Sequence, residues 1–128
     1  MTVKFNVVAR SDPRDLEAPK KYYPSLKSSG RMKLRQMAEE MAEISTLSSI
    51  DMMAALEALL VIIPRELGKG NIVELGDLGS FWLRAQTTGA EAAADVTAQN
   101  IAQLLPLFKP GQEFKNTLKD VDFQKAGQ

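Results

Sequence analysis

Asn71-Ile-Val-Glu-Leu-Gly-Asp-Leu-Gly-Ser-Phe81 is the segment of this chain that most strongly indicates its fold class. Two short apolar runs within it are joined by a Gly-x-x-Gly sequence, Gly76 to Gly79. Glycine permits positive φ angles and the close approach of two backbones, so this spacing predicts a tight turn between two strands. Because an apolar helical segment directly precedes the turn, the sequence predicts an α+β fold.

An amphipathic helix is predicted over about residues 33–43. Its apolar side chains recur at intervals of three and four residues, which places them on one face of a helix. These side chains are Leu34, Met37, Ala38, Met41 and Ile44. Carboxylates of the same segment, such as Glu39 and Glu43, fall on the polar face, where solvation explains them better than an acid/base pair or a metal site.

A second helix is predicted to begin after Ser48, because Ser48 and Asp51 have the spacing of a capping box. It should end near Gly68. From Met52 to Ile63, eleven of twelve residues are apolar, which is too many for a helix with one face in water. The simplest way to bury such a helix in a small domain is against a second copy of the chain, so the sequence predicts a homodimer.

The other predicted elements follow from alternation and turn residues. Apolar Val3, Phe5 and Val7 alternate with polar residues, as on a half-buried strand. In chain order, the elements are a strand over 2–9, an edge strand over 22–27, a strand over 72–75, a strand beginning near Phe81, a returning segment over 96–108 and a final helix over 112–120.

Formal net charge is zero, with 16 basic and 16 acidic residues, but the charges are unevenly distributed. Residues 1–35 hold nine Lys or Arg against three acids, residues 36–100 hold three against ten, and residues 101–128 hold four against three. A protein that binds nucleic acid needs a basic face to neutralise phosphates. Any such face should therefore draw on the start of the chain.

No cysteine or histidine is present in the 128 residues. Their absence excludes disulfides, thiolate zinc sites, cysteine or histidine nucleophiles and the usual imidazole base. We expect no enzymatic activity, no cofactor, no metal site and no small-molecule substrate. The N-terminus lacks a secretory signal pattern, and the apolar segment 52–63 is shorter than the ~20 residues that span a bilayer. We therefore expect a cytoplasmic protein without a membrane partner.

Three pieces of sequence, in this order, resemble the HU family of bacterial histone-like DNA-binding proteins, which also contains integration host factor. Members carry a Gly-Phe-Gly-Thr-Phe-like turn, a long two-stranded arm, a Phe-x-x-Gly return and a closing helix that bears lysine. Here Gly76 to Phe81 fills the turn and Phe108 to Gly111 fills the return. Leu118-Lys119 continues the closing helix.

The resemblance covers roughly residues 31–125. It implies an HU-like intertwined dimer with two N-terminal helices, a β-sheet with extended arms and a C-terminal helix. Residues 31–128 would form this HU-like DNA-binding domain. Residues 1–30 would form a strand-bearing N-terminal extension, similar to that found in one bacterial branch of the family.

In HU-like proteins the start of the first helix, the base of the arms and the last helix face the DNA. The candidates for phosphate contacts in this chain are Arg31, Lys33, Arg35, Arg84, Lys109, Lys115 and Lys119. Of these, Arg31, Lys109, Lys115 and Lys119 fall at or near positions that match the family. An ordinary solvated surface accounts for the same residues equally well.

The arm departs from the family pattern. Family arms are rich in Arg and Lys and carry a proline near the tip, which wedges between base pairs and kinks the duplex. Residues 84–107 contain one basic residue, Arg84, and two acids, Glu91 and Asp95, and their only proline, Pro106, lies at the base. Trp82 beside the turn is also unusual, and either stacking on nucleic acid or burial under the N-terminal extension would explain it.

The function expected from the resemblance is that of a nucleoid-associated, histone-like homodimer that binds duplex DNA. It would bind through backbone contacts with little sequence preference. The alternative is a dimeric structural or adaptor module that keeps the HU scaffold with little or no DNA binding. The ordered motifs and the basic first third favour DNA binding, whereas the neutral net charge and the depleted arm favour the adaptor.

Overall fold

The computed structural model describes residues 1–127 and contains three α-helices and two three-stranded sheets in that range. The mixed α+β class predicted from the sequence is confirmed. The chain forms two compact parts, which we describe separately. The body comprises Leu34–Asn116, and the end unit comprises residues 1–33 together with residues 117–127. Gln128, the last residue of the predicted 31–128 domain, lies outside the described residues.

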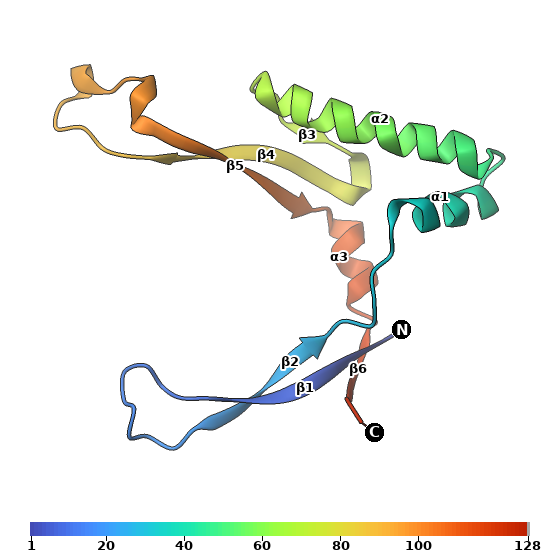
Figure 1. Cartoon of the computed structure of the whole chain (residues 1–128), viewed down its shortest axis with the longest axis horizontal. Coiled ribbons are helices and arrows are strands. Elements are labelled where there is room, and N and C mark those ends of the chain that lie inside the picture. Colours follow the sequence, from blue (N-terminus) through green and yellow to red (C-terminus); the bar gives the residue numbers. More distant parts are fainter. Residues whose placement is uncertain (128) are drawn as a thin grey trace. The chain divides into compact units, whose positions relative to one another are not determined.

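The body begins with two helices that pack against each other, α1 (Leu34–Glu43) and α2 (Ser49–Gly68) (Figure 1). The predicted capping box is confirmed. The Ser48 hydroxyl accepts a hydrogen bond from the Asp51 backbone N–H at 3.1 Å, and the Asp51 carboxylate accepts one from the Ser48 N–H at 3.3 Å. These bonds satisfy donors that the first turn of a helix otherwise leaves free.

The last turn of α2 is held by the carboxylate of Glu66. It accepts hydrogen bonds from the Asn71 side-chain amide at 3.0 Å and from the Lys69 ammonium at 3.2 Å. The Asn71 amide and then the Lys69 ammonium lower the pKa of Glu66 below its ordinary value. A lowered pKa in the folded state contributes stability above the ordinary carboxyl pKa, and that stability is lost as the pH falls through the lowered value.

The turn singled out in the sequence joins two strands of the first sheet, whose order is β3-β4-β5. Strand β3 (Val73–Glu74) pairs antiparallel with β4 (Gly79–Thr87), which pairs antiparallel with β5 (Ile101–Pro110). A 3₁₀ turn, Gly76–Leu78, connects β3 to β4. Strand β3 is shorter than the predicted 72–75, because Leu75 leaves the extended conformation (φ −111°, ψ 46°) to cap the 3₁₀ turn, where its carbonyl accepts from the Leu78 N–H at 3.2 Å.

Both glycines of the turn have the conformations that their spacing predicted. Gly76 has a φ of 58° and Gly79 a φ of 143°, which are values that residues with a side chain adopt rarely. A Cβ on Gly79 would also overlap the Lys109 carbonyl oxygen and the Phe108 ring. Gly79 is therefore required both for the backbone angle and for the close approach of β5.

The second sheet lies in the end unit and has the order β2-β1-β6. Strand β1 (Thr2–Arg10) pairs antiparallel with β2 (Lys21–Lys27), as on the predicted extension, and parallel with β6 (Asp122–Lys125) (Figure 1). Strand β6 was not predicted. The chain can supply it because α3 (Gln112–Leu118) ends two residues before the predicted end at residue 120.

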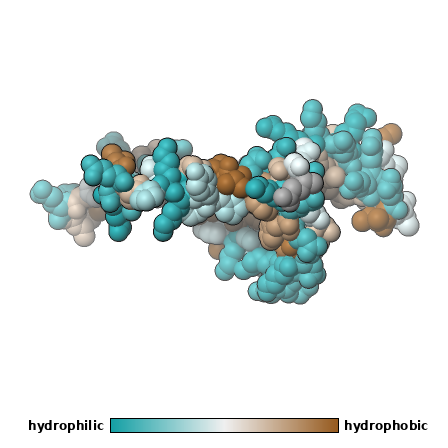
Figure 2. Space-filling model, turned by 90° about the horizontal axis from the view of Figure 1, so that it is seen from below, coloured by the Kyte–Doolittle hydropathy of each residue, from teal (hydrophilic) through white to brown (hydrophobic). Residues whose placement is uncertain are grey.

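Few side chains are buried within one chain. Among residues 1–127, the buried apolar side chains are Ala38, Met52 and Leu67. Many large apolar side chains stay exposed, and Figure 2 shows apolar residues standing among polar ones on the face that it presents. A domain of this length ordinarily buries about two thirds of its surface, so these apolar faces are incompletely covered.

Candidate nucleic-acid interface

The predicted arm is a two-stranded ribbon formed by β4 and β5 (Figure 1). Residues that pair across the strands share a face, and successive residues alternate between faces. Ser80 pairs with Lys109 and Arg84 pairs with Leu105, so Lys109 and Arg84 lie on the same face as Trp82. Four ladder positions separate the two basic residues, which corresponds to about 13 Å along the ribbon.

An aromatic cluster fixes the base of the arm. The Phe81 and Phe108 ring centroids are 4.9 Å apart, and the Phe108 and Phe114 centroids are 6.1 Å apart in an edge-to-face arrangement. Phe114 belongs to α3, so this contact joins the helix to the arm, with an aromatic contribution of about 1 kcal/mol per pair. Lys115, in the last turn of α3, is thereby held close to the base of the ribbon.

The tip of the arm, residues 88–100, is ordered by polar but uncharged side chains. Asn100 donates from its side-chain amide to the Thr88 carbonyl at 3.1 Å, and its own carbonyl accepts from the Thr88 N–H at 2.8 Å. Two 3₁₀ turns, Ala93–Asp95 and Ala98–Asn100, follow the connection. The returning strand consequently begins at Ile101, and the predicted start at residue 96 is wrong.

The tip of the arm carries no basic side chain. Its charged side chains are the acids Glu91 and Asp95, both exposed. Pro106 pairs with Leu83 inside the ribbon, well away from the tip. A proline wedge and cationic minor-groove contacts, which need these groups at the tip, have no counterpart among the described residues of this arm.

The seven predicted contact residues fall into two groups. Arg35, Arg84, Lys109 and Lys115 belong to the body, whereas Arg31, Lys33 and Lys119 belong to the end unit. All seven are exposed. Within the body, Lys109 lies at the base of the arm and Arg84 lies farther along the same face of the ribbon, whereas Lys115 belongs to α3, which contacts the opposite face through Phe114 and Phe108.

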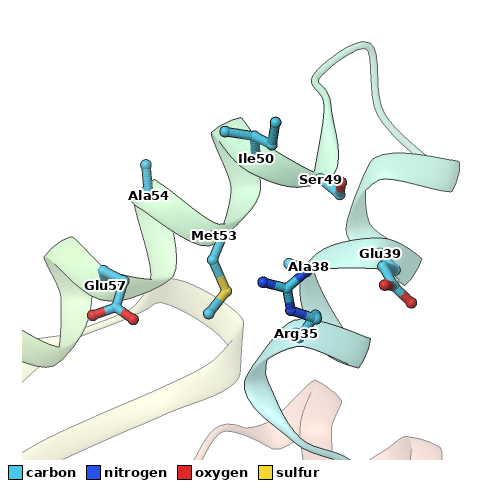
Figure 3. Close-up of a pocket in the computed structure, with 8 residues that line it drawn as sticks. All are labelled: Arg35, Ala38, Glu39, Ser49, Ile50, Met53, Ala54 and Glu57. Atoms are coloured by element: carbon cyan, nitrogen blue, oxygen red, sulfur yellow. The ribbon is translucent and has the colours of Figure 1, made fainter.

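Arg35 occupies a different place, beside a hollow of about 310 Å³ between α1 and α2. Its guanidinium extends between the helices toward Met53, while Glu39 points away (Figure 3). The rest of the lining is mainly apolar, with Ala38, Ile50 and Ala54. Its other polar groups are the exposed Ser49 hydroxyl and the exposed carboxylates of Glu39 and Glu57, so the hollow offers a packing surface rather than a reaction site.

Trp82 is half-buried and lines a second hollow with Leu67, Ile72 and Leu83 of the body. Side chains of its own unit thus cover part of the indole. The predicted cover by the N-terminal extension stays a prediction, and so does stacking on nucleic acid.

The sequence interpretation missed one group of basic residues. Lys4, Arg10, Lys21 and Lys27 lie on one face of the second sheet. The signal was available, because alternation of Val3, Phe5 and Val7 on one face places Lys4 and Arg10 on the other. Only the strand pairing, however, reveals that β2 adds two further lysines to the same face.

Among residues 1–127, no helix has the length and apolar character needed to cross a membrane. In the same part of the chain, no group of three or more acidic, cysteine or histidine side chains could hold a metal ion.

One family of known proteins matches nearly the whole sequence. The family model HU-HIG, described as an HU domain fused to a wHTH, Ig or glycine-rich motif, matches residues 1–125. No curated protein matches the chain.

Two solved structures share the fold. A proposed bacterial DNA-binding protein from Bacteroides vulgatus is 13% identical with a TM-score of 0.69, and the match covers 99% of this chain and 49% of that one. This chain thus spans about half of that protein's length. An Anabaena HU–DNA cocrystal structure is 22% identical with a TM-score of 0.56, and that match covers 70% of this chain and 99% of the HU chain. About 30% of this chain therefore lies outside the likeness to HU itself.

Proposed function

The chain belongs to the HU-HIG family of fused HU domains, and from this membership we propose that it is a non-enzymatic, histone-like protein that binds duplex DNA. The Anabaena relative was crystallised with DNA. The observation that carries the proposal is the ribbon with basic side chains at its base. Lys109 is exposed at the base within the return motif, Lys115 is exposed in α3 just after it, and Arg84 is exposed farther along the ribbon.

The mode of binding that these groups support is contact with the phosphate backbone. Exposed lysines neutralise phosphates and release counterions, but they do not distinguish one sequence from another. An uncharged tip without a terminal proline offers little means of wedging base pairs apart. We propose weak, sequence-tolerant binding without strong bending, in association with the nucleoid.

The proposed assembly is a homodimer built around α2. Leu59, Leu60, Val61 and Ile62 are all exposed within one chain. Four consecutive residues point in directions that together cover about 300° of a helix. Apolar side chains on nearly every side of α2 support its insertion into a second copy, as in an intertwined dimer.

The second candidate is a dimeric adaptor on an HU scaffold with little or no DNA binding. It is favoured by the arm, which carries Arg84 against Glu91 and Asp95, and by the zero net charge of the sequence. The two candidates differ in one measurable property, because only the first binds duplex DNA at low salt.

We expect the triple substitution of Arg84, Lys109 and Lys115 by Ala to weaken duplex binding uniformly across unrelated sequences. Loss of about three phosphate contacts should flatten the slope of log K against log salt by about 2 to 3. Fluorescence anisotropy with labelled duplexes measures both quantities. The single variant Lys115→Ala should lose part of this affinity, whereas its control Arg65→Ala, which removes one exposed charge from α2, should bind like wild type. Wild-type affinity and slope in the triple variant would mean that the ribbon does not contact DNA.

A further inference from the structure

The sheet of the end unit has two chemically different faces. Directly paired residues share a face, so the register of β1 with β2 and β6 assigns every side chain. One face is apolar and includes Val3, Phe5, Val7, Leu26 and Phe123. The opposite face, which we call the basic face, carries Lys4, Arg10, Lys21 and Lys27 together with Tyr23.

The basic residues of this face stand opposite one another. Lys4 pairs with Lys27 and Arg10 pairs with Lys21. Like charges directly across an antiparallel pair destabilise a sheet. Among the described residues, none of these four makes an ion pair within 4.0 Å, and Arg10 instead lies 5.7 Å above the Tyr23 ring. The fold therefore gathers positive charge here without compensating for it.

Few acidic groups lie near the basic face. Each of them lies at the end of the face or in the connection between β1 and β2. Asp122 is the acid on the face itself and lies at its end, opposite Thr2. Asp12 and Asp15, in the connection between β1 and β2, accept backbone hydrogen bonds from Arg14 at 2.8 Å and Glu17 at 3.1 Å. Glu17 belongs to the same connection. Asp12 borders the same hollow as Arg10 and Lys21, but among the described residues no ion pair within 4.0 Å joins it to either. The two like-charge pairs can therefore still take an external anion.

The spacing of the pairs suits an extended polyanion. Arg10 follows Lys4 by six residue steps along β1, which corresponds to about 20 Å of strand. Duplex DNA rises about 3.4 Å per base pair, so the two pairs span roughly six base pairs of phosphates. A single small anion could occupy only one pair.

We propose that the basic face of the end unit is a second DNA-contact surface, separate from the arm, which binds the phosphate backbone of duplex DNA. This inference rests on the proposed function and adds a site outside the part of the fold that resembles HU. The external phosphates offset the repulsion within the Lys4/Lys27 and Arg10/Lys21 pairs. The face tolerates any sequence, because it presents cations and no groups arranged to read base edges.

The test is Lys4→Glu in the full chain, compared with Lys125→Glu. Both substitutions reverse one charge on the same sheet, but Lys125 pairs with Phe5 and lies on the apolar face. We expect Lys4→Glu to weaken binding to a labelled duplex roughly tenfold at low salt and to flatten the salt slope by about 1, whereas Lys125→Glu should bind within about twofold of wild type.

Thermal stability separates lost contact from lost fold. The new carboxylate of Lys4→Glu faces Lys27, so the Tm should stay the same or rise by roughly 2 °C while DNA affinity falls. If that variant is destabilised, Lys4→Gln removes the charge without reversing it, and the same loss of affinity at wild-type Tm is expected.

Three results would overturn the inference. Wild-type affinity and slope in both Lys4 variants would remove the second surface and leave the arm as the DNA site. Binding of the wild type to phosphatidylserine vesicles but not to DNA, with loss in Lys4→Glu, would assign the face to a membrane surface. No duplex binding by the wild type under any salt condition would overturn this inference together with the proposed function.

Discussion

Replacing Leu60 with Asp should dissociate the protein into monomers. Leu60 is 57% exposed within one chain and belongs to the exposed apolar run Leu59 to Ile62 of α2. In the proposed dimer this side chain is buried, and an unpaired carboxylate there should cost at least ~3 kcal/mol, which raises the dissociation constant more than about 100-fold. Sedimentation velocity at micromolar concentration measures the change.

The control is Leu16→Asp, which introduces the same charge at a leucine that is 80% exposed in the connection between β1 and β2. This variant should remain a dimer with wild-type stability. A wild-type protein that sediments as a folded monomer at micromolar concentration would contradict the proposed assembly, whatever the behaviour of the Leu60 variant.

Substituting Gly79 by Ala should destabilise the protein by at least ~2 kcal/mol. The residue has a φ of 143°, and a Cβ would meet the backbone carbonyl oxygen of Lys109. Because backbone cannot yield as a flexible side chain can, β4 and β5 must separate at the base of the arm. Urea unfolding at a fixed protein concentration measures the loss.

Two other glycines provide a graded control series. Gly76 has a φ of 58° with open space around it, so Gly76→Ala should cost only the backbone strain, about 1 kcal/mol. Gly89 has open space and no positive φ, so Gly89→Ala should be neutral or slightly stabilising. Equal stability of the Gly79 and Gly89 variants would show that the turn does not determine the packing of the arm.

Local signals in the sequence predicted the elements of the body well. The Ser48/Asp51 capping box, the 3.6-residue apolar pattern and the glycine turn each depend on residues within a few positions. Their physical causes are local, so they can be read without tertiary structure. The boundaries that failed, at Leu75 and Ile101, depend on hydrogen bonds that the neighbouring turns form instead.

The arrangement of the end unit could not be predicted in the same way. The sequence of β6 is a short, mostly polar segment. It forms a strand because β1, more than a hundred residues earlier, offers a free edge for pairing. The basic face likewise depends on the register of β1 with β2, which a single sequence does not specify. Non-local pairing therefore determined both features that sequence reasoning missed.

The predicted contact residues also divide into those that local sequence could place and those that depend on tertiary packing. Lys109 could be placed at the base of the arm because it lies within the Phe108 to Gly111 return, and Lys115 could be placed in the helix that follows. Arg35 was assigned from its position near the start of a helix, yet its side chain extends toward Met53 in the hollow between α1 and α2. Periodicity identifies a helix face, but the partner packed against that face determines what a side chain touches.

Whether this protein binds duplex DNA can be measured by titrating the wild type with a labelled duplex at two salt concentrations. Contact with several phosphates predicts measurable binding at about 50 mM salt and a loss of roughly 50-fold or more at about 200 mM, because each contact contributes about 0.9 to the slope of log K against log salt. Unrelated duplex sequences should give the same curve. Absence of binding at the lower salt concentration would contradict the account and would identify the protein as an adaptor on an HU scaffold.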